Sequence, residues 1–405
     1  MRKFVILLLS IFIFSFLSQT LPAFARQESF LISSTVDYEF GKIIQFEAEL
    51  SSTQKVDQIQ LVIRSDQSAI ENIFSLEISP DNLLTFIYDP EIHGNIRAFS
   101  FVDYYYIATF EDGSTSQSPL QNFLYADNRF EWKRSTLNEN FTVYWFTDNE
   151  SFANKALAIA DKSIDHLNQF ISFPQLEESI SIISYSNPAD LQSALMLSGQ
   201  TWVAGHADPQ SSLVFLSIEQ NQQLEEEMGR QLPHEIAHIN LYRSTGSSYS
   251  SLPIWFNEGI ASLAEMTPNP NYQNLLLSAY DNDQLISMSN LCEIFPANSS
   301  SIALAYAQSD SFLRYLHREY GKAGLNRLLQ AYKEGDSCAF GTVTAFSISL
   351  ENLEEQWRKS IFQDVKNETN SSEVLPFLYI FGFISVSIFA IILSTLFKYR
   401  NSKRE

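Results

Sequence analysis

The sequence predicts a multi-domain chain: an all-β sandwich, then an α+β domain, then one C-terminal transmembrane helix. Three observations predict this order. Short β-rich runs separated by turns come first, helical spacing and further β-rich runs follow from about residue 131, and an uncharged stretch lies near the C-terminus. The length of 405 residues fits two or three domains at roughly 100–200 residues each. The hydrophobic content of 45% excludes global disorder.

Residues 1–25 are predicted to be a secretory signal peptide. Arg2 and Lys3 precede an apolar run that extends from Phe4 to Leu17, and the Ala-Phe-Ala tripeptide at 23–25 supplies the small residues of a cleavage site. The alternative is an uncleaved membrane anchor, although the apolar run is short for a full span.

Residues 26–128 are predicted to form an immunoglobulin-like β-sandwich. The β-rich runs in this region are 44–50, 59–63, 83–88 and 104–110. The first run alternates between apolar and polar residues, and the last ends in a Glu-Asp-Gly-Ser turn. Several short strands at this spacing are typical of a sandwich of about 100 residues.

Residues 129–365 are predicted to form the α+β domain. Apolar residues recur at helical spacing from Phe152 to Ile171, and β-rich runs follow at 180–184 and 213–218. Beyond residue 224 the pattern is mostly helical. An all-β region followed by mixed elements indicates two separate domains.

The C-terminal part is predicted to anchor the chain in a membrane. A polar linker at 366–373 precedes the predicted transmembrane helix at 374–397. The uncharged part of this helix has 23 residues and would extend about 34 Å, enough for a hydrocarbon core of about 30 Å. The basic tail at 398–405 predicts a cytoplasmic C-terminus, so the preceding domains would lie outside the membrane. A buried helix of a soluble domain is the alternative for the apolar stretch.

The chain is strongly acidic, with a formal net charge of −21. Such a chain repels phosphate backbones, so we expect no nucleic-acid partner. Cys292 and Cys338 both lie in the part predicted to be exported, where oxidation is favoured. We therefore expect one disulfide between them, with two buried free thiols as the alternative.

The pentapeptide His234-Glu235-Ile236-Ala237-His238 is the strongest functional pattern. On a helix, residues four apart lie on the same face, so both imidazoles can bind one zinc ion. Glu235 then lies beside the metal and can take a proton from the attacking water. The alternative is a surface helix with two titrating histidines.

A second pattern, Trp-Phe-Asn-Glu-Gly at 255–259, places Glu258 twenty residues after His238. A catalytic zinc ion needs three protein ligands and one open position. Glu258 is the expected third ligand, from a second helix packed antiparallel to the first, and Gly259 leaves room for close helix approach. The alternative for Glu258 is a solvated carboxylate on a helix surface.

Together these motifs resemble those of gluzincin metallopeptidases, and residues 128–362 resemble the bacterial peptidase MA-like family. Further segments that carry the resemblance are 127–132 (Asp-Asn-Arg-Phe-Glu-Trp), 202–205 (Trp-Val-Ala-Gly), 305–309 (Ala-Tyr-Ala-Gln-Ser) and 353–358 (Leu-Glu-Glu-Gln-Trp-Arg). The resemblance implies a zincin-like domain with one zinc ion per chain. It also implies hydrolysis of a peptide or protein substrate by a zinc-activated water, with Glu235 as the general base.

The resemblance suggests roles for further residues. Tyr306 corresponds to a tyrosine that stabilises the oxyanion in the aminopeptidase N branch; a core tyrosine is the alternative, and Tyr242 is a weaker competitor. Asn257 or Glu265 could orient a ligand imidazole, or could lie on a helix surface. The Gly-x-Met-Glu-Asn segment of that branch does not precede the zinc motif, so an exopeptidase is not supported. Pro233 predicts a kink or a later helix start.

The sequence thus predicts a membrane-anchored extracytoplasmic zinc metallopeptidase. One rival is a cell-surface binding protein that uses the β-sandwich and carries a non-catalytic zincin domain. Another is a zinc hydrolase that acts on non-peptide amides, such as cell-wall cross-links, with the same residues. The sequence determines neither the substrate nor the oligomeric state.

Overall fold

The computed structural model describes residues 30–65, 71–147, 149–173, 178–197, 205–219, 221–296 and 299–362. These residues form two compact units. The first comprises the described residues up to Phe130 together with 194–197, and the second the remaining ones from Glu131. The predicted signal peptide, linker, membrane helix and tail lie outside the described residues. Within the described ranges no helix is both long and apolar enough to cross a bilayer.

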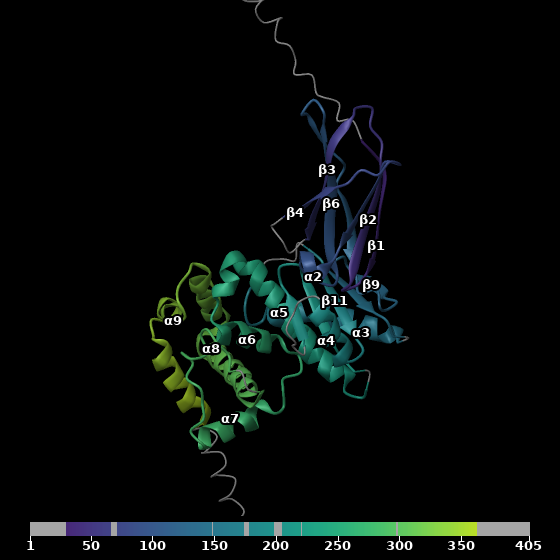
Figure 1. Ribbon diagram of the computed structural model, residues 1–405. Coiled ribbons are helices and arrows are strands. Elements are labelled where there is room, and N and C mark those ends of the chain that lie inside the picture. The colour runs from purple at the N-terminus through teal and green to yellow at the C-terminus, as the bar shows by residue number, and fades with distance from the viewer. Residues whose placement is uncertain are drawn as a thin grey trace, which may run out of the picture. The chain divides into compact units, whose positions relative to one another are not determined.

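The first unit is built from two antiparallel sheets (Figure 1). One sheet contains β1 (Leu31–Glu39), β2 (Ile43–Leu50) and β5 (Leu83–Tyr88). The other contains β3 (Val56–Ser65), β4 (Asn72–Leu76), β6 (Ser100–Phe110), β7 (Thr115–Gln117) and β8 (Gln121–Tyr125), and the short α2 (Pro90–His93) follows β5. Every second residue of β6 is buried, and Tyr104 of this strand packs on Phe46 of β2 with ring centroids 5.2 Å apart. The N-terminal region is therefore sheet-rich, with aromatic side chains between its two sheets.

The second unit begins with a five-stranded mixed sheet in the order β12-β13-β11-β10-β9. Its strands are β9 (Lys133–Leu137), β10 (Phe141–Trp145), β11 (Ile180–Tyr185), β12 (Gly205–Asp208) and β13 (Leu213–Ser217). The three central strands are parallel, whereas β9 and β12 run antiparallel at the two edges. Central strands of a parallel sheet are buried on both faces, and β13 accordingly reads Leu-Val-Phe-Leu.

Helices make up most of the rest of the second unit. They are α3 (Glu150–Leu167), α4 (Pro188–Leu197, whose last residues belong to the first unit), α5 (Leu224–Thr245), the 3-10 helix η1 (Gly246–Ser251), α6 (Ile254–Ala264), α7 (Tyr272–Asp281), α8 (Ser299–Lys333), α9 (Cys338–Phe346) and a last helix at 350–362. Figure 1 shows α6 between α5 and α8, and it packs on both. Leu232 and Ile236 of α5 enter the core of the sheet, while Ala237 and Leu241 enter the helical core. Helix α5 therefore joins the two cores.

Gly259 allows α6 and α8 to approach closely, as the sequence predicted. A Cβ atom at this position would lie 2.8 Å from the carbonyl oxygen of Ser309 and 2.6 Å from a methyl group of Leu313. Any larger residue would push the helices apart. Because Glu258 is the preceding residue, this contact also places the predicted third ligand.

The predicted disulfide between Cys292 and Cys338 is confirmed. It joins the segment after α7 to the start of α9. Next to it, the carbonyl of Cys292 accepts the N–H of Ile254 at 2.9 Å, and the carbonyl of Leu291 accepts the N–H of Trp255 at 3.0 Å. These bonds satisfy two donors in the first turn of α6, where no partner exists within the helix.

Candidate metal centre

Helix α5 continues across Pro233, so the later start that this proline suggested is not observed. His234 and His238 consequently lie one turn apart on the same face, with ring centroids 5.1 Å apart. Both side chains are largely buried, at 14% and 11% exposure. The pair is therefore not the surface pair that the alternative interpretation required.

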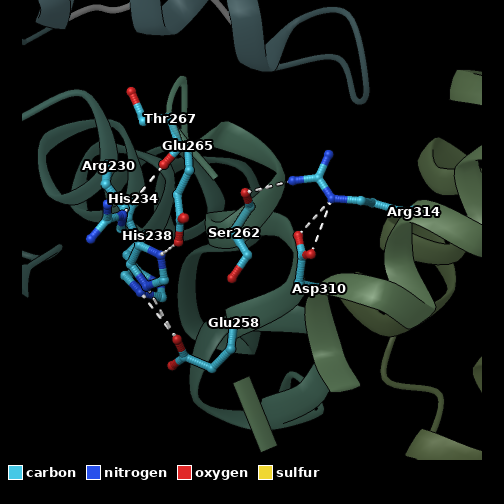
Figure 2. Close-up of polar contacts among 9 residues, drawn as sticks. All are labelled: Arg230, His234, His238, Glu258, Ser262, Glu265, Thr267, Asp310 and Arg314. Atoms are coloured by element: carbon cyan, nitrogen blue, oxygen red, sulfur yellow. Dashed lines mark hydrogen bonds and ion pairs between the residues drawn. The ribbon is translucent and has the colours of Figure 1, made fainter. Parts of the chain in front are cut away.

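Glu258 of α6 completes a group of three convergent side chains. Its Oε2 atom lies 3.4 Å from Nε2 of His234 and 3.7 Å from Nε2 of His238. Figure 2 shows both imidazoles turned toward this carboxylate. Ligands held roughly 2.0–2.2 Å from a tetrahedral zinc ion lie roughly 3.3–3.6 Å apart; the first distance falls in this range and the second lies just above it.

The second ring nitrogen of each imidazole, Nδ1, contacts a side-chain oxygen of a neighbouring residue. Nδ1 of His234 lies 3.1 Å from Oε1 of Glu265, and Nδ1 of His238 lies 3.0 Å from Oδ1 of Asn257. The amide of Asn257 also donates to the hydroxyl of Tyr249 at 3.2 Å. With Nδ1–H donated in both rings, each Nε2 is directed toward Glu258. The surface interpretation of these two partners is wrong, since Glu265 is only 5% exposed and Asn257 is half-buried.

Electrostatics favour a positive charge between these groups. Burial opposes the protonation of His234, but Glu258 and Glu265 outweigh it and raise the pKa of this imidazole to about 10. Burial also opposes the charge of Glu258, but His238 and His234 hold the pKa of this carboxyl below its usual value. His234 therefore holds a proton at neutral pH in the metal-free protein, and a metal that binds this imidazole would displace it.

The residues fit a zinc ion. Among the described residues, His234, His238 and Glu258 form a metal-binding constellation whose ligand atoms all lie within 4.8 Å of one another. Oε2 of Glu258 is buried, and it accepts no hydrogen bond of normal geometry from any residue that the structure describes. Two imidazole nitrogens and one carboxylate oxygen are the donor set of a three-ligand catalytic zinc site.

Glu235 lies between the two histidines in sequence and is 9% exposed. Burial raises the pKa of its carboxyl above the usual value, while His234, His238 and a backbone hydrogen bond from Ala207 lower it. The first effect dominates, so the carboxyl is a stronger base than an exposed glutamate. Ala207 belongs to the edge strand β12, so this strand lies beside the predicted base.

Two tyrosines border the group. Tyr306 of α8 packs edge-on against His234, with ring centroids 6.2 Å apart. Burial and the charges of Glu258 and Glu235 raise the pKa of Tyr306, and the same causes, partly offset by a hydrogen bond with Asn257, raise the pKa of Tyr249. Both phenols therefore keep their proton at neutral pH. Sequence reasoning missed Tyr249, whose one signal was its place as the tyrosine of the connection between the two motif helices.

Comparison with protein families identifies the second unit. The profile of the Peptidase MA superfamily matches residues 160–363. The chain belongs to this superfamily. The match includes α5 and α6, so it contains all three convergent residues. The resemblance seen in the sequence is confirmed, and membership of this superfamily supports a metallopeptidase.

Solved structures show only distant likeness. Native yeast LTA4 hydrolase is 11% identical, with a TM-score of 0.38 over 85% of this chain and 71% of its own. A polysaccharide deacetylase from Bacillus cereus is 11% identical, with a TM-score of 0.20 over 49% of this chain and 65% of its own. Scores this low carry no functional argument. A search of characterised proteins finds no significant match to the sequence.

Proposed function

We propose that the protein is a zinc-dependent metallopeptidase, anchored in a membrane with its catalytic domain outside the cytoplasm. The convergence of His234, His238 and Glu258 from two packed helices supports the metal assignment. Membership of the Peptidase MA superfamily supports a peptide or protein substrate. A zinc ion held by these residues would polarise the scissile carbonyl and lower the pKa of water.

Glu235 is the proposed general base. Its burial raises the pKa of the carboxyl toward neutrality, which suits a group that must first accept a proton and then release it. It takes the proton of the attacking water and delivers it to the leaving amine. The Ala207 hydrogen bond holds the carboxylate in place, so the base is oriented before substrate binds.

Tyr306 is the proposed oxyanion donor. Its phenol is protonated, largely buried and packed against His234, so its O–H is available for a developing negative charge. Tyr249 is a second candidate on the other side of the group, where its hydroxyl already accepts from Asn257 and its own proton remains available for donation. Substitution of each tyrosine by phenylalanine separates the two: the true donor should lose about 10²–10³ in kcat.

The edge strand β12 is the proposed docking site for an extended substrate. It is antiparallel to β13 at the border of the sheet, and its Ala207 contacts Glu235. A peptide that adds to a sheet edge is fixed by backbone hydrogen bonds, which do not depend on its side chains. This geometry presents a peptide bond to the base and supports cleavage within a chain.

The location rests on the two ends of the sequence and on the disulfide. The predicted signal peptide at 1–25 and the apolar segment at 374–397 would direct and anchor the chain. The bond between Cys292 and Cys338 favours an oxidising compartment, because cytoplasmic thiols are kept reduced. Protease accessibility of the catalytic domain in intact cells, compared with a C-terminal tag, tests this orientation.

A peptide-library digest with the zinc-loaded protein tests the activity. We expect cleavage within peptides that a chelator abolishes and added zinc restores. Glu235→Gln should keep the metal and lose about 10²–10⁴ in kcat, because the amide cannot accept the proton. Absence of peptide cleavage by a zinc-loaded parent would contradict the proposal, and cleavage of cell-wall amides instead would identify the rival hydrolase.

A further inference from the structure

The carbonyl of Gly229 has lost its partner within α5. In an α-helix this oxygen accepts the N–H of the residue four positions later, which here is Pro233, and proline has no N–H. The carbonyl instead accepts the backbone N–H groups of Met266, at 2.9 Å, and Thr267, at 3.3 Å. A proline in the helix interior thus provides an acceptor for another segment.

That segment is the turn that follows α6. The helix ends at Ala264, and Glu265 has non-helical backbone angles (φ −58°, ψ 118°). Its side chain is therefore placed by the way the turn is docked, and not by helix geometry alone. A second bond docks the turn, because Nε of Arg230 donates to the carbonyl of Thr267 at 3.4 Å (Figure 2).

A glycine at position 229 leaves room for the side chain of Thr267 in this turn. A Cβ atom there would lie 2.8 Å from Oγ1 of Thr267. Gly229 and Pro233 therefore act together: the glycine allows the turn to approach, and the proline leaves the acceptor that binds it. Both lie within five residues of the first predicted metal ligand, His234.

The docked turn carries the carboxylate that supports this ligand. Oε1 of Glu265 lies 3.1 Å from Nδ1 of His234, and Glu265 is almost fully buried. A carboxylate behind a ligand imidazole fixes its tautomer and orientation and raises its basicity. A displacement of the turn would therefore be transmitted to the metal site through Glu265.

We propose that Pro233 is a positioning residue of the metal site. By leaving the Gly229 carbonyl open, it docks the turn at 265–267 and holds Glu265 against His234. The proposal rests on the proposed metal site, but the docking itself is a property of the metal-free chain, so the two can be tested separately.

Pro233→Ala in the full-length chain is the decisive variant. Alanine is compatible with the helix and supplies an N–H that competes for the Gly229 carbonyl. In the metal-free protein we expect faster amide hydrogen exchange at Met266 and Thr267, without loss of thermal stability. We also expect zinc affinity to fall about 10- to 100-fold and the absorption bands of a Co²⁺-substituted sample to shift.

Glu265→Ala and the double variant with Pro233→Ala show whether the effect passes through Glu265. In the Glu265→Ala background, Pro233→Ala should cause no further loss of zinc affinity. Unchanged exchange at Met266 and Thr267 would overturn the docking role, whatever the metal affinity. Unchanged zinc affinity and Co²⁺ spectrum, or fully additive losses in the double variant, would overturn the link to the ligand. If the parent binds no zinc and Pro233→Ala still exchanges faster at Met266 and Thr267, the metal site is refuted while the docking of the turn stands.

Discussion

The two sides of the candidate metal centre are supported in different ways. On the His238 side the partner is Asn257, a neutral amide that precedes the ligand Glu258 on α6. On the His234 side the partner is Glu265, a carboxylate that lies beyond the end of the same helix. One support is therefore part of a helix, whereas the other is charged and belongs to a turn.

This difference separates two physical requirements of the site. A support within α6 keeps its place as long as the helix forms, since Asn257 and Glu258 share one backbone. A support outside the helix needs its own docking, which the Gly229 carbonyl provides. In return, the carboxylate can make a charge-assisted bond, roughly twice as strong as a neutral one. The hydrogen bond that supports His234 is thus the stronger of the two. Its position is also the more easily disturbed, because it depends on the docking of the turn.

Glu258→Ala should have the largest effect on metal binding, because both sides converge on this ligand. We expect zinc affinity to fall by more than about 100-fold, beyond the range for residues that only support a ligand. Competition with a chromophoric chelator measures it. Glu355→Ala, an exposed glutamate paired with Lys359, is the control and should bind zinc like the parent. Parent-like zinc affinity in Glu258→Ala would show that Glu258 is not a zinc ligand.

Comparison of Glu265→Ala with Asn257→Ala tests the asymmetry itself. Both should lower zinc affinity within about 10- to 100-fold, with Glu265→Ala at the upper end because it removes a charge as well as a hydrogen bond. The same chelator competition at fixed pH gives the ratio. A larger loss in Asn257→Ala would reverse the proposed ranking of the two sides.

Glu265→Gln should make the two sides alike. The amide can still accept the Nδ1–H of His234 but no longer carries the charge, so the loss should be smaller than in Glu265→Ala, about tenfold or less. Isothermal titration would also show less proton uptake by the buffer, since His234 would hold a proton less strongly in the metal-free state. Parent-like zinc affinity in Glu265→Gln would mean that the charge contributes nothing, and equal losses in Glu265→Gln and Glu265→Ala would mean that the hydrogen bond of a neutral amide contributes nothing.

The disulfide should matter for stability and little for the metal. Replacing Cys292 and Cys338 by serine opens a loop with a sequence separation of 46 residues. We expect the free energy of unfolding to fall by about 2–4 kcal/mol in urea. Zinc affinity should change by less than about twofold, because the backbone hydrogen bonds from the first turn of α6 to Cys292 and Leu291 do not need the disulfide. Loss of zinc in the double variant would show that the start of α6 depends on this bond.

Features that need only local periodicity could be predicted from the sequence. The spacing of His234 and His238 follows from helix geometry, and the two cysteines of the chain allow a single pairing. Gly259 was also predictable, because a glycine inside a helical pattern indicates close approach. Four strands of the first unit, β2, β3, β5 and β6, coincide with the β-rich runs of the sequence, whereas β1, β4, β7 and β8 were not predicted.

Features that depend on tertiary docking could not be predicted. The sequence shows that Pro233 removes one N–H, but not which donors occupy the freed carbonyl. The role of Glu265 depends on that docking, and the same residue on an undocked turn would be a surface carboxylate. Tyr249 lies in a serine-rich connection without periodicity, so no pattern distinguishes it from a solvated tyrosine.

Metal content tests the central claim most directly. Elemental analysis of the full-length protein, purified from zinc-replete medium, should give about one zinc ion per chain in the parent and in Glu235→Gln. It should give far less in a variant without His234, His238 or Glu258. A parent chain without zinc, or full zinc content after loss of these ligands, would contradict the account.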